Sequence, residues 1–135
     1  MITVKEVAVQ SEVTSDTVRH YVKLELLKPV RNPFNGYREF SVADVKRVRF
    51  IRRAKLLGFS LKEIKQILKD SARGESPCPF VREIMELRIA EHKRKLNEML
   101  ALDKRMKDAL RKWQLMPDGV PDGASICHLI ESFSE

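Results

Sequence analysis

The chain has 135 residues, of which 43% are hydrophobic and 33% charged, and its net charge at pH 7 is +7. No stretch approaches the roughly 18 consecutive apolar residues of a membrane span, and the first residues lack the apolar segment of a secretory signal, so we expect a cytoplasmic protein without a membrane partner. Only two cysteines occur, Cys78 and Cys127, which argues against a fold built on disulfides and favours reduced thiols.

The positive charge is concentrated in the first half of the chain. Residues 1–73 contain 16 Lys and Arg against 8 Asp and Glu, a net charge of +8, whereas residues 74–135 have a net charge of −1. Lys and Arg gain affinity for a phosphate backbone by releasing its condensed counterions. The distribution is typical of a polyanion-binding region joined to a neutral module, although a solvated basic surface produces the same charge.

Two short helices are predicted at the start of the chain. Thr3 and Glu6 have the spacing of a capping box, in which each side chain accepts from the other residue's backbone N–H, so a first helix should run over about Val4–Gln10. Thr14 is placed to cap a second helix over Ser15–Lys23. The short connection between them indicates a helix-turn-helix.

A helix-turn-helix presents its second helix to the major groove of DNA. The alternative is an ordinary helical hairpin inside a small core. In the DNA-binding interpretation, the candidate contact residues are Thr14, Ser15, Asp16, Thr17, Arg19 and His20.

A β-hairpin is predicted next. The Asn-Gly dipeptide at 35–36 best tolerates the positive φ angles of a tight turn, and aromatic residues alternating with charges flank it. Such a hairpin would form a wing beside the second helix. Arg31 and Arg38 would then place cations on both strands, within reach of phosphates or a minor groove, and Tyr37 is a further candidate contact.

Two more helices are predicted after the wing. Ser41 caps the first of them, which Gly58 ends, and Ser60 and Glu63 form the capping box of the second. The apolar positions of the first, at helical spacing, are Val45, Val48, Ile51, Ala54 and Leu57, and those of the second are Leu61, Ile64, Ile67 and Leu68. The order is therefore two helices, a wing and two helices.

Three segments in this order and spacing resemble the MerR family of regulators. They are Val18-Arg19-His20-Tyr21, the wing at 35–40 and the segment 50–64, and the resemblance covers roughly residues 1–72. The family commonly has Arg-Tyr-Tyr-Glu where this chain has Arg19-His20-Tyr21-Val22. The resemblance carries over Arg19 and Tyr21 as residues that contact DNA. It implies a winged helix-turn-helix that binds double-stranded promoter DNA as a dimer and distorts it, in response to an effector, so that RNA polymerase engages.

A long helix follows from Phe80 to Trp113, because neither Gly nor Pro occurs there and helix-forming residues dominate. At a spacing of 3.5 residues, the seam positions are Met85, Ile89, His92, Leu96, Met99, Asp103, Met106, Leu110 and Trp113. Only His92 and Asp103 are polar. We expect a coiled coil, which the resemblance implies is an antiparallel homodimer. The fold class is thus mainly α, with a DNA-binding domain at 1–75, a dimerisation helix at 76–113 and an effector-binding end at 114–135.

The C-terminal end reads as a loop rich in Pro, Gly and Asp over 114–125, followed by a short helix. In the heavy-metal sensors of the family, a cysteine before the long helix and cysteines in such a loop bind the metal across the dimer. Cys78 and Cys127 match the first and last of these, while the cysteine near the beginning of the loop is absent from 113–117. The resemblance implies a Zn, Cd, Pb or Hg site on the two cysteines, with His128 as a further candidate ligand.

Other functions remain open from the sequence. Cys78 of one chain and Cys127 of the other are also suited to a regulatory disulfide or to capture of a reactive electrophile. A further alternative is that both are small buried hydrophobic residues. A protein that bends DNA without any effector needs neither cysteine. An enzyme is disfavoured, because the three histidines lie in different segments and no phosphate-binding Gly loop or nucleophile motif occurs.

Overall fold

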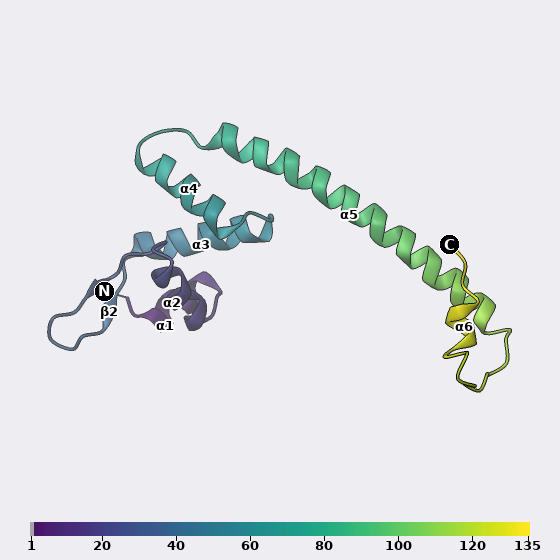
Figure 1. Ribbon diagram of the computed structural model, residues 1–135. Helices are drawn as coiled ribbons and strands as arrows, with labels where there is room; N and C mark the ends of the chain where they lie inside the picture. The colour runs from purple at the N-terminus through teal and green to yellow at the C-terminus, as the bar shows by residue number, and fades with distance from the viewer. Residues whose placement is uncertain (1) are drawn as a thin grey trace. The chain divides into compact units, whose positions relative to one another are not determined.

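The computed structural model describes residues 2–135 and is mainly helical, as predicted (Figure 1). The chain divides into two units, Met1–Met85, here called the head unit, and Glu86–Glu135, the tail unit. The elements of the head unit are α1 (Val4–Ser11), α2 (Ser15–Lys23), β1 (Val30–Arg31), β2 (Arg38–Glu39), α3 (Val42–Leu56), α4 (Leu61–Ala72) and the start of α5 (Cys78–Trp113). The tail unit contains the rest of α5 and α6 (His128–Glu131).

Side-chain caps set the starts of the first helices. Thr3 Oγ1 accepts from the N–H of Glu6 at 3.2 Å, and Thr14 Oγ1 accepts from the N–H of Thr17 at 3.1 Å. The helix α1 runs one residue further than predicted, to Ser11, and ends where Glu12 adopts a left-handed conformation with φ of 58°. Both helices of the predicted helix-turn-helix are confirmed.

The caps predicted for the next two helices are confirmed, and at Ser41, predicted only as a cap, the structure has a full capping box. Ser41 and Asp44 exchange hydrogen bonds at the start of α3, as Ser60 and Glu63 do at the start of α4. Leu57, the last of the apolar positions at helical spacing in α3, lies outside the core, with an exposed fraction of 61%. Leu57 is the residue that caps α3 at its end, and the chain turns there at Gly58.

The core lies among α1–α4. Phe59, two residues after Leu57, belongs to this core, with an exposed fraction of 4%. The buried apolar residues are Val7, Ala8, Val18, Tyr21, Leu26, Leu27, Phe40, Val45, Val48, Ile51, Ala54, Phe59, Ile64 and Ile67. Partly buried residues of the first turns of α5, namely Phe80, Val81, Ile84 and Met85, pack against this core. The head unit ends ten residues past the boundary predicted at 75, and Met85, the first predicted seam position, packs against the head core.

The wing is an antiparallel pair in which Val30 lies opposite Glu39 and Arg31 opposite Arg38. Its turn is longer than the predicted two-residue turn. The N–H of Asn32 donates to the Tyr37 carbonyl at 2.8 Å, which leaves a four-residue loop over 33–36, and within this loop only Gly36 has a positive φ, 73°. The wing is confirmed, while its turn type is corrected.

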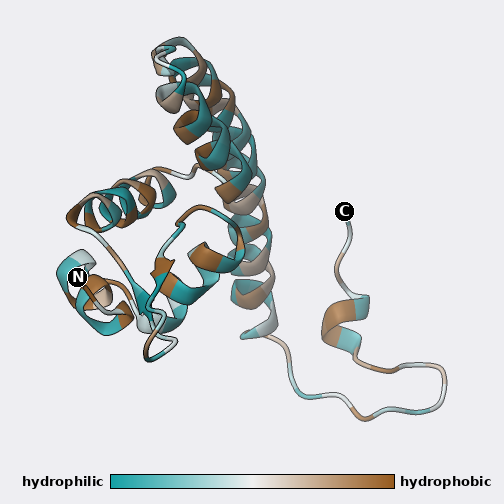
Figure 2. Ribbon diagram, turned by 90° about the vertical axis from the view of Figure 1, so that its left-hand side faces the viewer, coloured by the Kyte–Doolittle hydropathy of each residue, from teal (hydrophilic) through white to brown (hydrophobic). Residues whose placement is uncertain are grey.

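The helix α5 continues without a break for 36 residues, a length of about 54 Å at 1.5 Å per residue. Figure 2 shows hydrophobic residues recurring along it, and none of its residues is fully buried. A loop over 114–127 leads to α6, as the sequence predicts. Across residues 2–135, no helix is long and apolar enough to cross a membrane.

Candidate functional site

The residues predicted to face DNA from the second helix lie on α2 or at its cap. They are Thr14, Ser15, Asp16, Thr17, Arg19 and His20, of which Ser15 and Thr17 are half-buried and the others exposed. Arg19 Nη1 lies 2.9 Å from Asp16 Oδ1. Both side chains of this ion pair are largely exposed to water, so the pair contributes little to folding stability. Arg19 can therefore leave Asp16 and bind a phosphate with a small loss of free energy.

Tyr21 was predicted both to belong to the apolar stripe of α2 and to contact DNA. The first prediction is confirmed, since only 6% of the residue is exposed, and this burial raises the pKa of its phenol. The second stays a prediction, and the small exposed part of Tyr21 is all that a contact with DNA can use. His20, its neighbour on α2, is exposed and has its ring centroid 6.4 Å from that of Tyr21.

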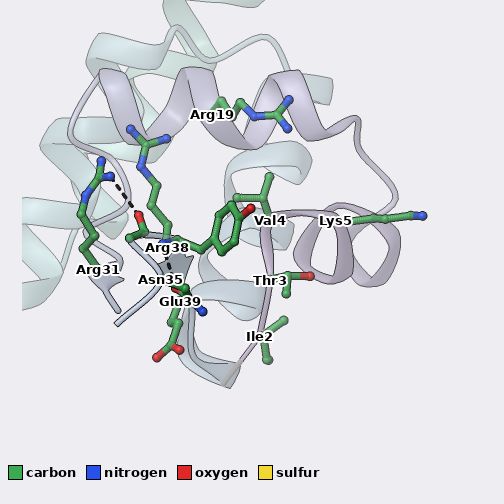
Figure 3. Close-up of a pocket in the computed structure, with 11 residues that line it drawn as sticks. Ile2, Thr3, Val4, Lys5, Arg19, Arg31, Asn35, Arg38 and Glu39 are labelled. Atoms are coloured by element: carbon green, nitrogen blue, oxygen red, sulfur yellow. Dashed lines mark hydrogen bonds between the residues drawn. The ribbon is translucent and has the colours of Figure 1, made fainter. Parts of the chain in front are cut away.

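A hollow of about 640 Å³ lies in the head unit between the wing and the start of α1 (Figure 3). It is lined by Ile2, Thr3, Val4, Lys5, Arg19, Arg31, Asn35, Gly36, Tyr37, Arg38 and Glu39. Arg19 comes from α2, Arg31 from β1 and Arg38 from β2, so three predicted contact residues from separate elements surround one space. Tyr37, a fourth, also lines it and is 75% exposed.

The electrostatics of this hollow favour an anion. Four cationic side chains line it, including Lys5, which the sequence analysis did not single out, against the single carboxylate of Glu39. That carboxylate is already engaged, because Glu39 Oε1 accepts from Asn32 Nδ2 at 2.7 Å. A phosphate backbone is the polyanion that such a cationic surface beside an exposed helix binds.

Some of the positive charge of the head unit is structural. Arg47 Nε donates to the Leu26 carbonyl at 2.7 Å, and Arg49 donates to the Gln10 carbonyl through Nε and Nη2 at 3.1 and 2.9 Å. These guanidinium groups tie α3 to the segments around α1 and α2. Because these two arginines also connect elements of the fold, the residues that line the hollow beside the wing indicate the candidate phosphate contacts better than the net charge of +8 does.

The predicted seam of α5 is an exposed apolar face. Among its members in the tail unit, the exposed fractions are 61% for Ile89, 57% for Leu96, 68% for Met99, 60% for Met106 and 53% for Leu110. Apolar side chains at this spacing on one helix face normally contact another helix. The polar position Asp103 forms an i,i+4 ion pair with Lys107 at 2.8 Å, and this bond raises the pKa of Lys107.

The C-terminal loop, residues 114–127, is held closed by His128. Its Nε2 lies 2.9 Å from the Pro117 carbonyl oxygen, which only accepts, so Nε2 donates the hydrogen in this bond. The ring also lies against the backbone of Gly119, where an added Cβ would be 2.3 Å from His128 Cδ2. Gly119 therefore has no room for a side chain while this bond persists.

Two carboxylates hold the rest of the loop. Glu131 Oε1 accepts from the backbone N–H groups of Cys127 and Ile126, both at 2.7 Å, and these bonds lower the pKa of Glu131. Asp122 Oδ1 accepts from the N–H of Ser125 at 2.9 Å and of Ala124 at 3.0 Å, which lowers the pKa of Asp122. Both acids, like His128, are thus engaged in shaping the loop.

Both thiols remain free to bind a metal. Within residues 2–135, no three His, Cys, Asp or Glu side chains of one chain are gathered in a way that could hold an ion. Cys78, at the first position of α5, is exposed, and Cys127 is half-buried beside a hollow of about 440 Å³ in the tail unit that His128 and Asp118 also line. Two thiolates fit a soft, thiophilic ion.

Comparison with known proteins gives family matches over most of the chain. Residues 2–71 match the family described as MerR HTH family regulatory protein, and residues 45–109 match the family described as MerR, DNA binding. The HTH-type transcriptional regulator HmrR of Rhizobium leguminosarum bv. viciae is 34% identical over 97 residues, covering 72% of this chain and 74% of its own. The HTH-type transcriptional regulator ZntR of Escherichia coli K12 is 31% identical over 136 residues, covering 100% of this chain and 94% of its own.

A solved structure shares the arrangement along nearly the whole chain. The crystal structure of the transcription regulator PbrR691 from Ralstonia metallidurans CH34, determined in complex with lead(II), superimposes with a TM-score of 0.76 at 26% identity and covers 98% of both chains. These relatives are transcription regulators and not enzymes. The winged head followed by a long helix is therefore an arrangement that this chain shares with a metal-bound regulator.

Proposed function

The chain belongs to the MerR family of helix-turn-helix regulatory proteins, and we propose that it is a regulator that binds a palindromic promoter as a homodimer and distorts it in response to a metal ion. The observation that carries the DNA-binding part is the convergence of Arg19, Arg31 and Arg38 around one hollow beside α2. These cations lie on three elements, so they can neutralise phosphates on the same stretch of backbone while α2 enters the major groove.

Dimer formation is supported by the exposed seam of α5. Hydrophobic residues more than half exposed recur along this face, and a second copy of the helix would bury them. Two heads held by such a pair would bind two half-sites of a palindrome, which multiplies the affinity of each head. RNA polymerase is the further partner that the proposed promoter binding implies.

The DNA-binding proposal is tested by selecting duplexes from a randomised pool with the full-length protein. We expect enrichment of an inverted repeat, with sedimentation showing two chains per duplex. If no sequence is enriched and the protein binds all duplexes with the same dependence on salt, the proposal of a specific promoter is wrong. A DNA-bending protein without sequence preference would then be the better interpretation.

For the effector, we propose a soft metal ion bound by the thiolates of Cys78 and Cys127 from different subunits. Two observations support this proposal: both cysteines are free thiols, which suit a soft ion, and the similar regulator PbrR691 was determined with lead(II). Cys78 begins the 36-residue α5, and Cys127 follows its end in the chain, so pairing two copies is the proposed way to join them. His128 is the third candidate ligand, through Nδ1.

Mixed dimers test this arrangement directly. We expect reduced wild-type protein titrated with Hg(II) or Pb(II) to show thiolate absorbance that Cys78→Ser and Cys127→Ser each abolish. A dimer assembled from one Cys78→Ser chain and one Cys127→Ser chain should regain one of the two sites, because one Cys78 then meets one Cys127. Absorbance retained in both single variants would sink the metal proposal.

The second candidate is a thiol switch, which the exposure of Cys78 favours. In this reaction, two thiols lose two electrons and two protons to an oxidant such as a peroxide and form one disulfide between subunits. Non-reducing electrophoresis after peroxide treatment would show a cross-linked dimer that both Ser variants lack. Thiol counting with elemental analysis on protein purified under reduction distinguishes this candidate from the metal sensor.

The metal is proposed to act on DNA shape. An effector that stabilises one of two dimer states changes the deformation energy of the bound promoter. We expect Hg(II) or Pb(II) to alter the footprint across the promoter spacer more than the Kd. A large change of Kd with an unchanged footprint would contradict this mechanism.

A further inference from the structure

The tip of the wing carries an aromatic side chain that the DNA-binding surface described above does not use. Phe34 is 96% exposed, the highest value among the exposed large hydrophobic residues of the described chain. Leaving a phenyl ring in water is unfavourable, and a single exposed apolar residue at a loop tip would need no explanation by itself. The hydrogen bonds that fix the loop and the cations around it suggest that Phe34 contacts a ligand.

The loop that presents Phe34 is fixed by a network of hydrogen bonds. Asn32 Oδ1 accepts from the N–H of Phe34 at 2.8 Å and from the N–H of Asn35 at 3.3 Å, and the N–H of Gly36 donates to the Asn32 carbonyl at 2.9 Å. Arg31 Nη1 donates to the Gly36 carbonyl at 3.0 Å. Since the backbone on both sides of Phe34 is tied to the strands, the ring is presented without a large loss of loop entropy on binding.

The surroundings of the tip are cationic. Arg31 and Arg38 face each other across the strands below it, and Tyr37, three residues further on, is also exposed. Aromatic side chains flanked by arginines suit the minor groove of DNA, where apolar deoxyribose faces lie between two rows of phosphates. An acidic protein surface would match the arginines but would offer no such regular apolar strip.

We propose that Phe34 packs into the minor groove beside the half-site read by α2, as an apolar contact flanked by the phosphate contacts of Arg31 and Arg38. This inference rests on the proposed DNA binding. It adds a residue that carries no charge, so its contribution is separable from the electrostatic one by its dependence on salt.

The test uses the full-length protein and the duplex that the wild type enriches from a randomised pool. We expect Phe34→Ala to weaken binding about tenfold with an unchanged slope of log K against log salt, because no phosphate contact is lost. Phe34→Leu should regain most of the affinity. Arg38→Ala should instead lower the salt slope by about one. Leu56→Ala, which removes another exposed apolar side chain of the head unit, is the matched control and should bind as the wild type does.

Hydroxyl-radical footprinting locates the contact, because this reagent attacks deoxyribose from the minor groove. We expect the wild type to protect a short minor-groove segment that Phe34→Ala leaves cleaved, while protection around the α2 half-site persists. If Phe34→Ala binds and protects like the wild type, the inference is overturned and the proposed function stands. If the wild type enriches no duplex, the proposed function itself fails.

Discussion

Arg19 has two kinds of neighbour: it lines the hollow beside the wing, and it forms an ion pair with Asp16 on the surface of α2. The pair is exposed, so breaking it has little effect on folding. We expect Arg19→Ala to weaken promoter binding at every sequence and to lower the salt slope by about one, with an unchanged Tm. Asp16→Asn is the matched variant, because it frees Arg19 while leaving its charge. Equal losses in both variants would place the effect in the pair rather than in the cation.

Closure of the C-terminal loop depends on Gly119. A methyl group there meets the ring of His128, so we expect Gly119→Ala to displace the ring and break its bond to the Pro117 carbonyl. Hydrogen exchange at residues 117–131 should accelerate. In Gly119→Ala combined with His128→Ala, exchange should be no faster than in His128→Ala alone, because the bond is already lost. Additive effects would show that Gly119 acts on the loop independently of His128.

Glu131 makes the loop sensitive to acid. Its pKa is lowered chiefly by the backbone N–H of Cys127 and then by that of Ile126. A carboxyl group whose pKa is lower in the closed loop stabilises that loop at pH values above its ordinary value of 4.5, and the contribution is lost as the pH falls through the lowered pKa. Asp122 acts in the same direction. Both contributions to the closed loop should therefore be fully present at neutral pH.

This acid sensitivity is measurable at the amide of Cys127. We expect its NMR shift to titrate below pH 4.5 in the wild type and to lose most of this dependence in Glu131→Gln, which keeps the shape of the side chain without its charge. A titration near neutral pH in the wild type, surviving in the variant, would assign the transition to another group.

At the scale of the elements, the exposed apolar seam of α5 is the proposed dimer interface. Leu96 lies on the exposed apolar face and Asn97 is its exposed neighbour one residue along, so Leu96→Glu and Asn97→Glu add the same charge to different faces. We expect Leu96→Glu to sediment as a monomer and to bind a palindromic duplex much more weakly, since bivalent binding is lost. The Asn97→Glu variant should remain dimeric. A dimeric Leu96→Glu protein would move the interface off the predicted seam.

The helices were the most predictable part of the fold, because their starts depend on local chemistry. Each of the first four helices is capped by a hydroxyl side chain that bonds to a backbone N–H three residues later, a pattern visible in the sequence. The caps are Thr3, Thr14, Ser41 and Ser60. The wing turn was less predictable. The Asn-Gly dipeptide indicates a two-residue turn, but the side chain of Asn32 holds a longer one, and competition between such side chains is decided by the folded backbone.

Tertiary contacts account for the remaining differences. Leu57 keeps the helical spacing of the core residues, yet the end of α3 turns it out and brings Phe59 in. The sequence predicted Arg19, Arg31 and Arg38 as separate candidates on one helix and two strands, but not that they line one hollow. Lys5 was missed because a single lysine on a short helix carries no signal. For the C-terminal loop, the sequence indicates Cys127 and His128 as candidate ligands. It does not indicate that His128 is hydrogen-bonded to the Pro117 carbonyl.

At the scale of the whole molecule, the division between the two units falls inside α5 and not in the loop that precedes it. Phe80, Val81, Ile84 and Met85 cover the head core although they belong to the long helix. A head shortened at residue 75 would leave that part of the core uncovered. This arrangement limits how such a gene can recombine: a head exchanged between regulators must bring the first two turns of its long helix with it, and the crossover that preserves both parts lies beyond residue 85.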